Sequence, residues 1–211
     1  MADKNISGIV SILKRAYPDA VCSLDHTDPF QLLIATILSA QCTDVRVNLV
    51  TPALFRKYPG PAGMAKAGTA DLEKLIHSTG FYKNKALSLK EASKSIIKNF
   101  GGKVPRTMEE LLTLRGVARK TANVVLGSAY GLASGVVVDT HVKRLAFRLG
   151  VTKETDPVKI ERDLMQALPK TEWIWFAHAL VLHGRSVCGA RKPLCGKCPL
   201  TKICPKNGVK K

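Results

Sequence analysis

The sequence has 211 residues, with 33 Lys and Arg against 16 Asp and Glu, a formal net charge of +17 and a pI near 9.8. This length is enough for one or two domains with a real hydrophobic core, and the charge favours a polyanionic partner, nucleic acid above all. The longest apolar run, around Leu32 to Leu38, is too short to span a bilayer, and no hydrophobic signal region opens the sequence. We therefore expect a soluble, intracellular protein with no membrane partner.

Apolar periodicity predicts helix after helix, with Gly and Pro in the gaps. The segments expected to be helical are about 6–17, 30–38, 44–54, 71–78, 83–100, 107–113, 119–130, 140–149, 157–168 and 172–183. The second is apolar nearly all round, which predicts a central buried helix. The one β-like run, Val136–Val138, has no alternating partner nearby, so we expect an extended entry to the next helix. The predicted fold class is all-α.

Helix-capping signals support these boundaries. Asp28 precedes Pro29, which is typical of an N-cap followed by proline at the first helical position. Thr43 or Asp44 can cap the following helix. Thr107 with Glu110 three residues later is a capping-box signal.

Between the helices predicted at 107–113 and 119–130 stands Leu114–Ala118, a segment so short and glycine-centred that it must be a tight turn. A helix–hairpin–helix directs backbone N–H groups outward at the start of its second helix, where a phosphate can dock. One residue into that helix is Lys120, and about twenty positions later comes Asp139, at a predicted N-cap. A helix N-terminus in a strongly cationic chain disfavours the ammonium form of a lysine.

Four cysteines lie close together near the C-terminus, at Cys188, Cys195, Cys198 and Cys204. The segment between them has little apolar content, so a crosslink must hold it. An intracellular chain disfavours disulfides, which leaves Zn²⁺ or an iron–sulfur cluster. Zinc sites usually pair two short Cys-x-x-Cys knuckles, and only one short pair exists here, so the spacing favours [4Fe–4S]. Cys22 and Cys42 stand alone and are expected to be packed thiols.

Three motifs together resemble the endonuclease III family of iron–sulfur DNA glycosylases with abasic-site lyase activity, over essentially the whole chain. They are the hairpin segment Leu114–Asn123 with its lysine, the Val138–His141 run around Asp139, and the Cys-x6-Cys-x2-Cys-x5-Cys segment. The resemblance implies a six-helix domain at 22–132 and a cluster domain formed by 1–21 with 133–211. It also implies that DNA lies in the cleft between them and that the four cysteines hold a [4Fe–4S] cluster.

The chemistry of base excision fits the same residues. A lysine amine can attack the deoxyribose anomeric carbon and persist as a Schiff base, which permits β-elimination of the 3′ phosphate. Asp139 can take the lysine proton or face the developing positive charge, as carboxylates do in glycoside hydrolysis. The resemblance implies oxidised pyrimidines as the excised bases, double-stranded DNA with damaged or abasic sites as the partner, and a monomer acting in the cytoplasm at the nucleoid.

Further DNA contacts follow from the resemblance. A flipped base leaves a gap, which the family fills with a glutamine, here Gln41, and an apolar wedge, here Phe81 in place of the more usual leucine. Phe81 could instead be an ordinary core aromatic. Other expected DNA contacts are the hairpin residues Arg115, Gly116, Val117, Ala118 and Arg119, together with Arg191 and Lys192 in the cysteine segment.

The hairpin departs from the family's usual Leu-Pro-Gly-Val-Gly. Arg115 replaces the proline and Ala118 the second glycine, so we expect Gly116 to hold the positive φ and Arg115 to make an additional phosphate contact.

Two alternatives remain at this point. The adenine-specific mismatch glycosylase has the cysteine motif but lacks a lysine at the position of Lys120, and it carries a further C-terminal domain, whereas seven residues follow Cys204 here. A non-catalytic helix–hairpin–helix DNA-binding protein with a redox-sensing cluster would keep the hairpin and the cysteines alone.

Overall fold

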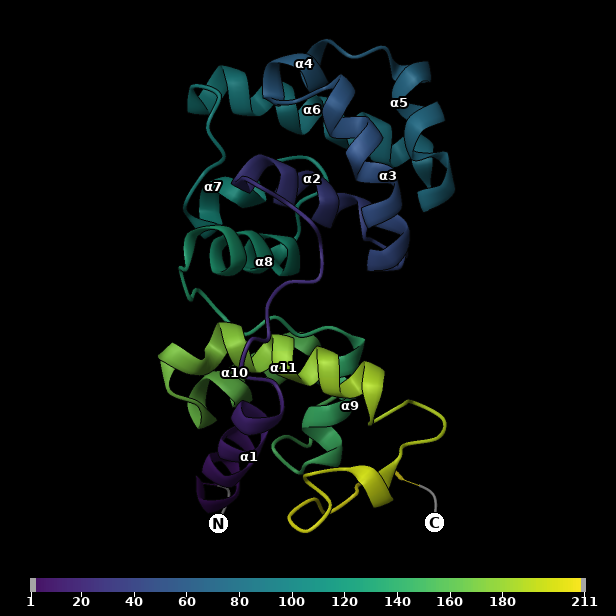
Figure 1. The fold of residues 1–211 in the computed structure, drawn as a ribbon. Helices are drawn as coiled ribbons and strands as arrows, with labels where there is room; N and C mark the ends of the chain where they lie inside the picture. The colour runs from purple at the N-terminus through teal and green to yellow at the C-terminus, as the bar shows by residue number, and fades with distance from the viewer. Residues whose placement is uncertain (1–2, 210–211) are drawn as a thin grey trace. The chain divides into compact units, whose positions relative to one another are not determined.

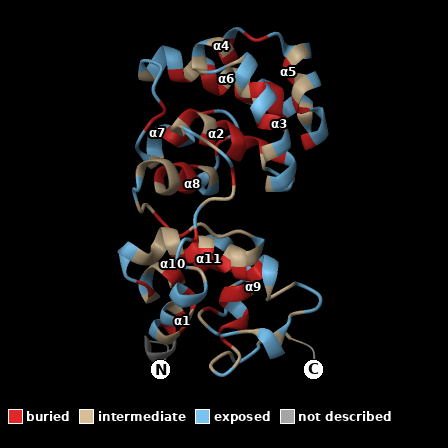
Figure 2. Cartoon of the chain, viewed as in Figure 1, coloured by how far each residue is buried: buried red, intermediate tan, exposed pale blue. Residues whose placement is uncertain are grey.

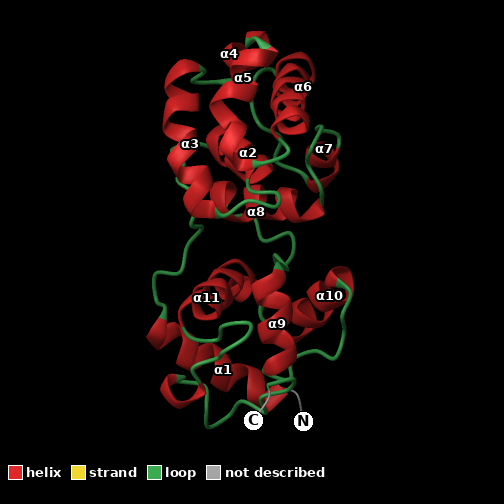
Figure 3. Cartoon of the chain, turned by 90° about the vertical axis from the view of Figure 1, so that its right-hand side faces the viewer, coloured by secondary structure: helices red, strands yellow, loops and turns green. Residues whose placement is uncertain are grey.

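The computed structural model describes residues 3–209, and all regular structure in that range is helical, as expected (Figures 1 and 3). None of the described helices is both long enough and apolar enough to cross a membrane. The α-helices are α1 (Asp3–Ala16), α2 (Pro29–Leu38), α3 (Asp44–Lys57), α4 (Pro61–Lys66), α5 (Thr69–Ile76), α6 (Tyr82–Phe100), α7 (Met108–Leu112), α8 (Arg119–Tyr130), α9 (Thr140–Arg148), α10 (Pro157–Ala167) and α11 (Trp173–Ser186). Short 3₁₀ helices are η1 (His77–Thr79), η2 (Lys170–Glu172) and η3 (Cys195–Lys197).

The chain divides into two compact units, residues 22–132 and residues 1–21 with 133–211. The first unit contains seven α-helices, α2 to α8, where six were expected. The additional helix is α4, which has six residues and begins at Pro61 directly after Gly60. Proline at a first helical position is favourable, but a helix this short and flanked by Pro and Gly reads in sequence as a loop.

Helix α2 is the centre of the unit formed by residues 22–132. Seven consecutive residues, from Leu32 to Leu38, are buried, and α3, α6 and α8 all pack against the helix (Figure 2). Its start is fixed by the Asp28 side chain, whose Oδ1 accepts the Gln31 N–H at 2.9 Å, with Pro29 at the first helical position. The predicted buried helix and its cap are both confirmed.

The other predicted caps form as well. Thr43, rather than Asp44, caps α3 by accepting the Arg46 N–H at 3.2 Å. Thr107 accepts the Glu110 N–H at 3.3 Å while its hydroxyl donates to Glu110 Oε2 at 2.8 Å. Each satisfies a backbone donor that a helix N-terminus would leave unpaired.

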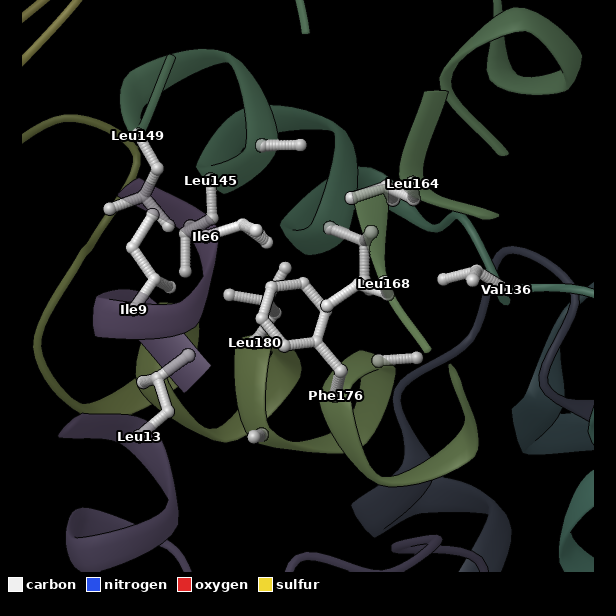
Figure 4. Packing of buried hydrophobic residues seen from close by; sticks show 14 of the residues in the cluster. Ile6, Ile9, Leu13, Val136, Leu145, Leu149, Leu164, Leu168, Phe176 and Leu180 are labelled. Atoms are coloured by element: carbon white, nitrogen blue, oxygen red, sulfur yellow. The ribbon is translucent and has the colours of Figure 1, made fainter. Parts of the chain in front are cut away.

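The unit formed by residues 1–21 and 133–211 has its own hydrophobic core. Side chains of α1, α9, α10 and α11 point toward one another around the buried ring of Phe176 (Figure 4). Trp173 and Trp175 pack against this core, and their indole N–H groups donate to Leu168 O and Tyr17 O, each at 3.0 Å. The two tryptophans are therefore partly buried at the edge of this core, and Phe176 lies inside it.

Two of the segments outside the α-helices of this unit also contribute to its core. Val136–Val138 runs without regular structure into α9, with Val136 fully buried, as the sequence predicted. Between α11 and residue 209 the one regular element is η3, and the segment contributes buried Leu200 to the core, with Ile203 packed against it.

Candidate active site, DNA-contacting loops and cysteine cavity

The hairpin between α7 and α8 is a tight turn anchored by two buried side chains. Leu114 and Val117 are buried, and the Val117 N–H donates to Leu114 O at 3.1 Å. Between them Gly116 has φ +82°, the left-handed conformation expected for it. A Cβ on this glycine would also lie 2.9 Å from Ser88 Cβ on α6, so both backbone conformation and packing require glycine.

Ala118 differs from Gly116 in conformation. Its φ of −99° and ψ of 170° are extended, and it serves as the N-cap residue of α8. An L-residue adopts this conformation without strain. The departure from a second glycine is therefore accommodated by the backbone, as the sequence predicted.

Lys120 is the second residue of α8 and its side chain is exposed. The hairpin's own basic residues, Arg115 and Arg119, are exposed as well. Arg115 lies near Glu91 on α6: the pKa of the Glu91 carboxyl is lowered mainly by a hydrogen bond from Lys94, and the Arg115 charge contributes. The start of α8 thus combines a backbone turn suited to a phosphate with three cationic side chains.

Asp139 is the N-cap of α9, and its Oδ1 accepts the Val142 N–H at 2.8 Å. One carboxylate oxygen is sufficient for a cap, so the other can serve chemistry. Two histidines, His141 and His178, are close enough to Asp139 for its charge to raise their pKa, although burial is the larger effect and lowers the pKa of both. Lys120 and Asp139 belong to different units, and their joint action stays a prediction.

Gln41 and Phe81 share an unusual backbone conformation. Their φ values are +55° and +48°, and they are two of the three non-glycine residues with positive φ among residues 3–209. Gln41 is exposed, and Phe81 is exposed to 65% although it is a large apolar residue. The alternative that Phe81 is a core aromatic is therefore wrong.

The four C-terminal cysteines line one small cavity of about 20 Å³, together with Arg148 and His183. Cys188 Sγ accepts a hydrogen bond from Arg148 Nη1 at 3.3 Å, and Cys198 Sγ lies 3.4 Å from His183 Nε2. No group of three or more His, Cys, Asp or Glu side chains within residues 3–209 is placed to hold a single metal ion. Cys22 and Cys42 do not line the cavity.

Comparison with known proteins identifies a family that spans most of the chain. A model of the HhH-GPD superfamily of base excision DNA repair proteins matches residues 34–170. The chain is also 59% identical over 197 residues to endonuclease III of Synechocystis sp., which covers 93% of this chain and 90% of that protein. The chain belongs to the endonuclease III family.

Two solved structures extend the similarity to the whole fold. A non-covalent endonuclease III–DNA complex matches with a TM-score of 0.92 and 41% identity, covering 97% of this chain and 95% of that one. A trapped endonuclease III–DNA covalent intermediate matches with a TM-score of 0.91 and 41% identity, covering 97% and 96%. This endonuclease III family member is a base excision repair enzyme, a DNA glycosylase with abasic-site lyase activity. The non-catalytic alternative is set aside.

Sequence reasoning missed two features of this site. Arg148 is buried and donates to Gly189 O and Ala190 O, each at 2.8 Å, which holds the segment that carries the exposed residues Arg191 and Lys192. Lys85 is buried beneath the Gln41 and Phe81 loops. Both look like solvated cations in the sequence, because only tertiary contacts distinguish a buried cation from an exposed one.

Proposed function

We propose that Lys120 is the nucleophile of a bifunctional glycosylase/lyase that excises oxidised pyrimidines from double-stranded DNA and cleaves the strand 3′ to the resulting site. The observation that carries this proposal is the exposed Lys120 amine at the second residue of α8, directly after a hairpin built to hold a phosphate. The trapped covalent intermediate of the relative supports attack by a protein group on DNA.

The steps follow from the chemistry of an amine and the anomeric carbon, which bonds both the ring oxygen and the base nitrogen. The Lys120 amine attacks the anomeric carbon, and the glycosidic bond breaks with its electron pair leaving on the base, which takes up a proton. The attached nitrogen loses a proton, and its lone pair then displaces the ring oxygen, which takes up a proton as the ring opens. The lysine is now a protonated Schiff base. Loss of a proton from the adjacent sugar carbon then expels the 3′ phosphate by β-elimination.

Asp139 is proposed to accept the lysine proton or to stabilise the oxocarbenium-like transition state. Its place at the N-cap of α9 supports this role, because the cap fixes the carboxylate while occupying only one oxygen. Gln41 and Phe81 are proposed to fill the space that a flipped nucleotide leaves. Their exposure and their positions in turns support this assignment. The preference for oxidised pyrimidines rests on the family resemblance.

Cys188, Cys195, Cys198 and Cys204 are proposed to hold a [4Fe–4S] cluster. The residues fit that group: four thiols line one cavity, and Arg148 already donates to the Cys188 sulfur. Burial raises the pKa of the Cys198 and Cys204 thiols, so a positive centre among them is needed to stabilise thiolates. A bound cluster would crosslink a segment with little core of its own, and the segment would then present Arg191 and Lys192 to DNA.

Borohydride reduction tests the nucleophile, because it converts a Schiff base to a stable covalent protein–DNA adduct. Lys120→Ala is expected to abolish trapping and strand cleavage on abasic DNA, while DNA affinity stays within about tenfold, since one screened charge contributes little. Lys83→Ala is the matched control, since Lys83 is the exposed second residue of α6, and it is expected to trap normally. Trapping that persists in Lys120→Ala would reject Lys120 as the nucleophile.

A further inference from the structure

A buried ammonium connects the two loops that carry Gln41 and Phe81. Lys85 on α6 is only 6% exposed, and its Nζ donates to Leu38 O and to Thr79 O, each at 2.8 Å. Leu38 is the last residue of α2, three positions before Gln41, and Thr79 is the last residue of η1, two positions before Phe81. One side chain therefore holds the backbone just upstream of both loops.

The second loop is joined to α6 by one side-chain bond and one backbone bond. Besides the bond from Nζ to Thr79 O, the backbone N–H of Lys85 donates to Phe81 O at 3.0 Å. Phe81 precedes α6 as its N-cap residue but makes no side-chain cap, and its left-handed φ of +48° is disfavoured for an aromatic residue. The backbone bond is the first bond of α6 and would form with any residue at position 85, so the contribution specific to the Lys85 side chain is the bond to Thr79 O, two residues before Phe81.

The burial of the Lys85 ammonium disfavours folding. Burial lowers the pKa of the Lys85 ammonium, with the neighbouring Cys42 acting in the opposite direction and less strongly. The protonated form is therefore penalised on folding, and an apolar side chain of similar volume would avoid that penalty. What an apolar side chain could not do is bind two carbonyl oxygens from segments 41 residues apart in the chain.

We propose that Lys85 is a positioning residue that fixes the Gln41 and Phe81 loops relative to each other in the free enzyme, so that both side chains enter the duplex together when a damaged nucleotide is extruded. This inference rests on the proposed role of Gln41 and Phe81. Lys85 itself is not a catalytic residue, since its ammonium is buried under the loops. Prior fixation of the loops removes the cost of ordering them during base extrusion.

A double-mutant cycle tests the proposal, with excision of an oxidised pyrimidine from duplex DNA measured in single turnover at saturating enzyme. Lys85→Met keeps the aliphatic stem and removes the donors. It is expected to slow excision by about tenfold to a hundredfold, because a displacement of about 1 Å in groups that position a substrate has an effect of that size. In a Gln41→Ala/Phe81→Ala background the same change is expected to have almost no further effect, because its only route to the reaction is gone.

Lys98→Met is the matched control, as Lys98 is an exposed lysine in the last turn of the same helix, and it is expected to leave excision unchanged in both backgrounds. Equal slowing by Lys85→Met in both backgrounds would overturn the proposal, and so would no slowing in the wild-type background. If Gln41→Ala/Phe81→Ala alone leaves excision unchanged, the proposed function of those loops fails as a separate result, and slowing by Lys85→Met then contradicts positioning as well.

If Lys85→Met does not yield folded protein, the cycle is run with Lys85→Arg. That variant keeps the charge and the donors but places them beyond the position of the ammonium, so the loops are displaced without loss of their partners. The expected result is the same slowing in the wild-type background, absent from the double-alanine background. If Lys85→Arg excises the base at the wild-type rate, the proposal is overturned.

Discussion

At the scale of the residue, one substitution can separate the structural role of Asp139 as an N-cap from its proposed catalytic role. Asp139→Asn keeps an oxygen that can accept the Val142 N–H, so the N-cap of α9 persists and the melting temperature is expected to stay close to that of the wild type. The charge is lost, so base excision is expected to fall by about a hundredfold or more, a usual loss for one acid–base or electrostatic group. Calorimetry and single-turnover excision measure the two effects.

Asp156→Asn is the matched control for Asp139→Asn. Asp156 caps α10 by accepting the Val158 and Lys159 N–H groups, each at 3.0 Å, and has no proposed catalytic duty. Its variant is expected to retain full excision. A loss of stability without a loss of turnover in Asp139→Asn would mean that Asp139 is only a cap.

Residues differ in how far the sequence could predict them. Asp139 as a cap and Gly116 as the left-handed residue follow from local rules, because capping and positive φ depend on neighbours in the chain. Lys85 could not be found this way. It stands in a run of Lys, Asn and Tyr that is typical of an exposed segment. Its Nζ bonds both Thr79 O, six residues earlier, and Leu38 O at the end of α2, 47 residues earlier, and this second contact is not visible in the local sequence.

At the scale of the element, the hairpin tolerates a side chain at one of its two small positions. Gly116→Ala places a Cβ at φ +82° and 2.9 Å from Ser88 Cβ. The left-handed conformation alone costs roughly 1–2 kcal/mol, and the contact with Ser88 adds to that. Urea unfolding is expected to show this loss of stability, together with weaker binding to abasic DNA.

Ala118→Gly is the companion to Gly116→Ala. The extended conformation of Ala118 needs no glycine, so restoring the family's residue is expected to change stability by less than about 1 kcal/mol through backbone entropy. Equal losses in Gly116→Ala and Ala118→Gly would contradict the assignment of the positive φ to Gly116 as the reason for glycine there.

Arg115 in the same hairpin is predicted to contact a DNA phosphate. It is exposed, and its neighbour Glu91 already bonds Lys94, so the guanidinium is not committed to that carboxylate. Arg115→Pro, which restores the family's residue, is expected to reduce the slope of log affinity against log salt by about one unit. Single-turnover cleavage at saturating enzyme is expected to be unchanged. An unchanged salt slope would place Arg115 in solvent.

Helix prediction succeeded where an apolar period or a capping box marked the segment, as at the short helix α7, and it failed at α4, which has neither. The buried helix α2 and the long helix α6 follow from their apolar pattern, whereas α4 is one and a half turns of Pro, Ala, Gly, Met, Ala and Lys with no complete period. Its single fully buried large side chain, Met64, is insufficient to distinguish a short helix from a loop.

At the scale of the whole molecule, each unit is stabilised by its own set of packed helices, and the cysteine segment adds little to either. The core around Phe176 is built from α1, α9, α10 and α11, to which the segment after α11 contributes one fully buried residue, Leu200. Loss of the proposed cluster should therefore release residues after Ser186 while the helices persist. The protein purified without oxygen is expected to contain about four irons per chain.

Cys198→Ser tests this separation of the segment from the helical cores. The variant is expected to lose iron and soluble yield. Its helical circular dichroism should change little, because residues 187–209, the described part of the segment beyond α11, contain η3 as their one regular element. Limited proteolysis should cut the variant first between Val187 and Val209, a region that the proposed cluster is expected to protect in the wild type. Cys22→Ser is the matched control, since Cys22 does not line the cavity, and it is expected to keep both iron and protection.

Stoichiometric zinc in wild-type protein made with ample iron would overturn the cluster assignment. Loss of most helical signal in Cys198→Ser would mean instead that the cysteine segment supports the fold of the whole unit.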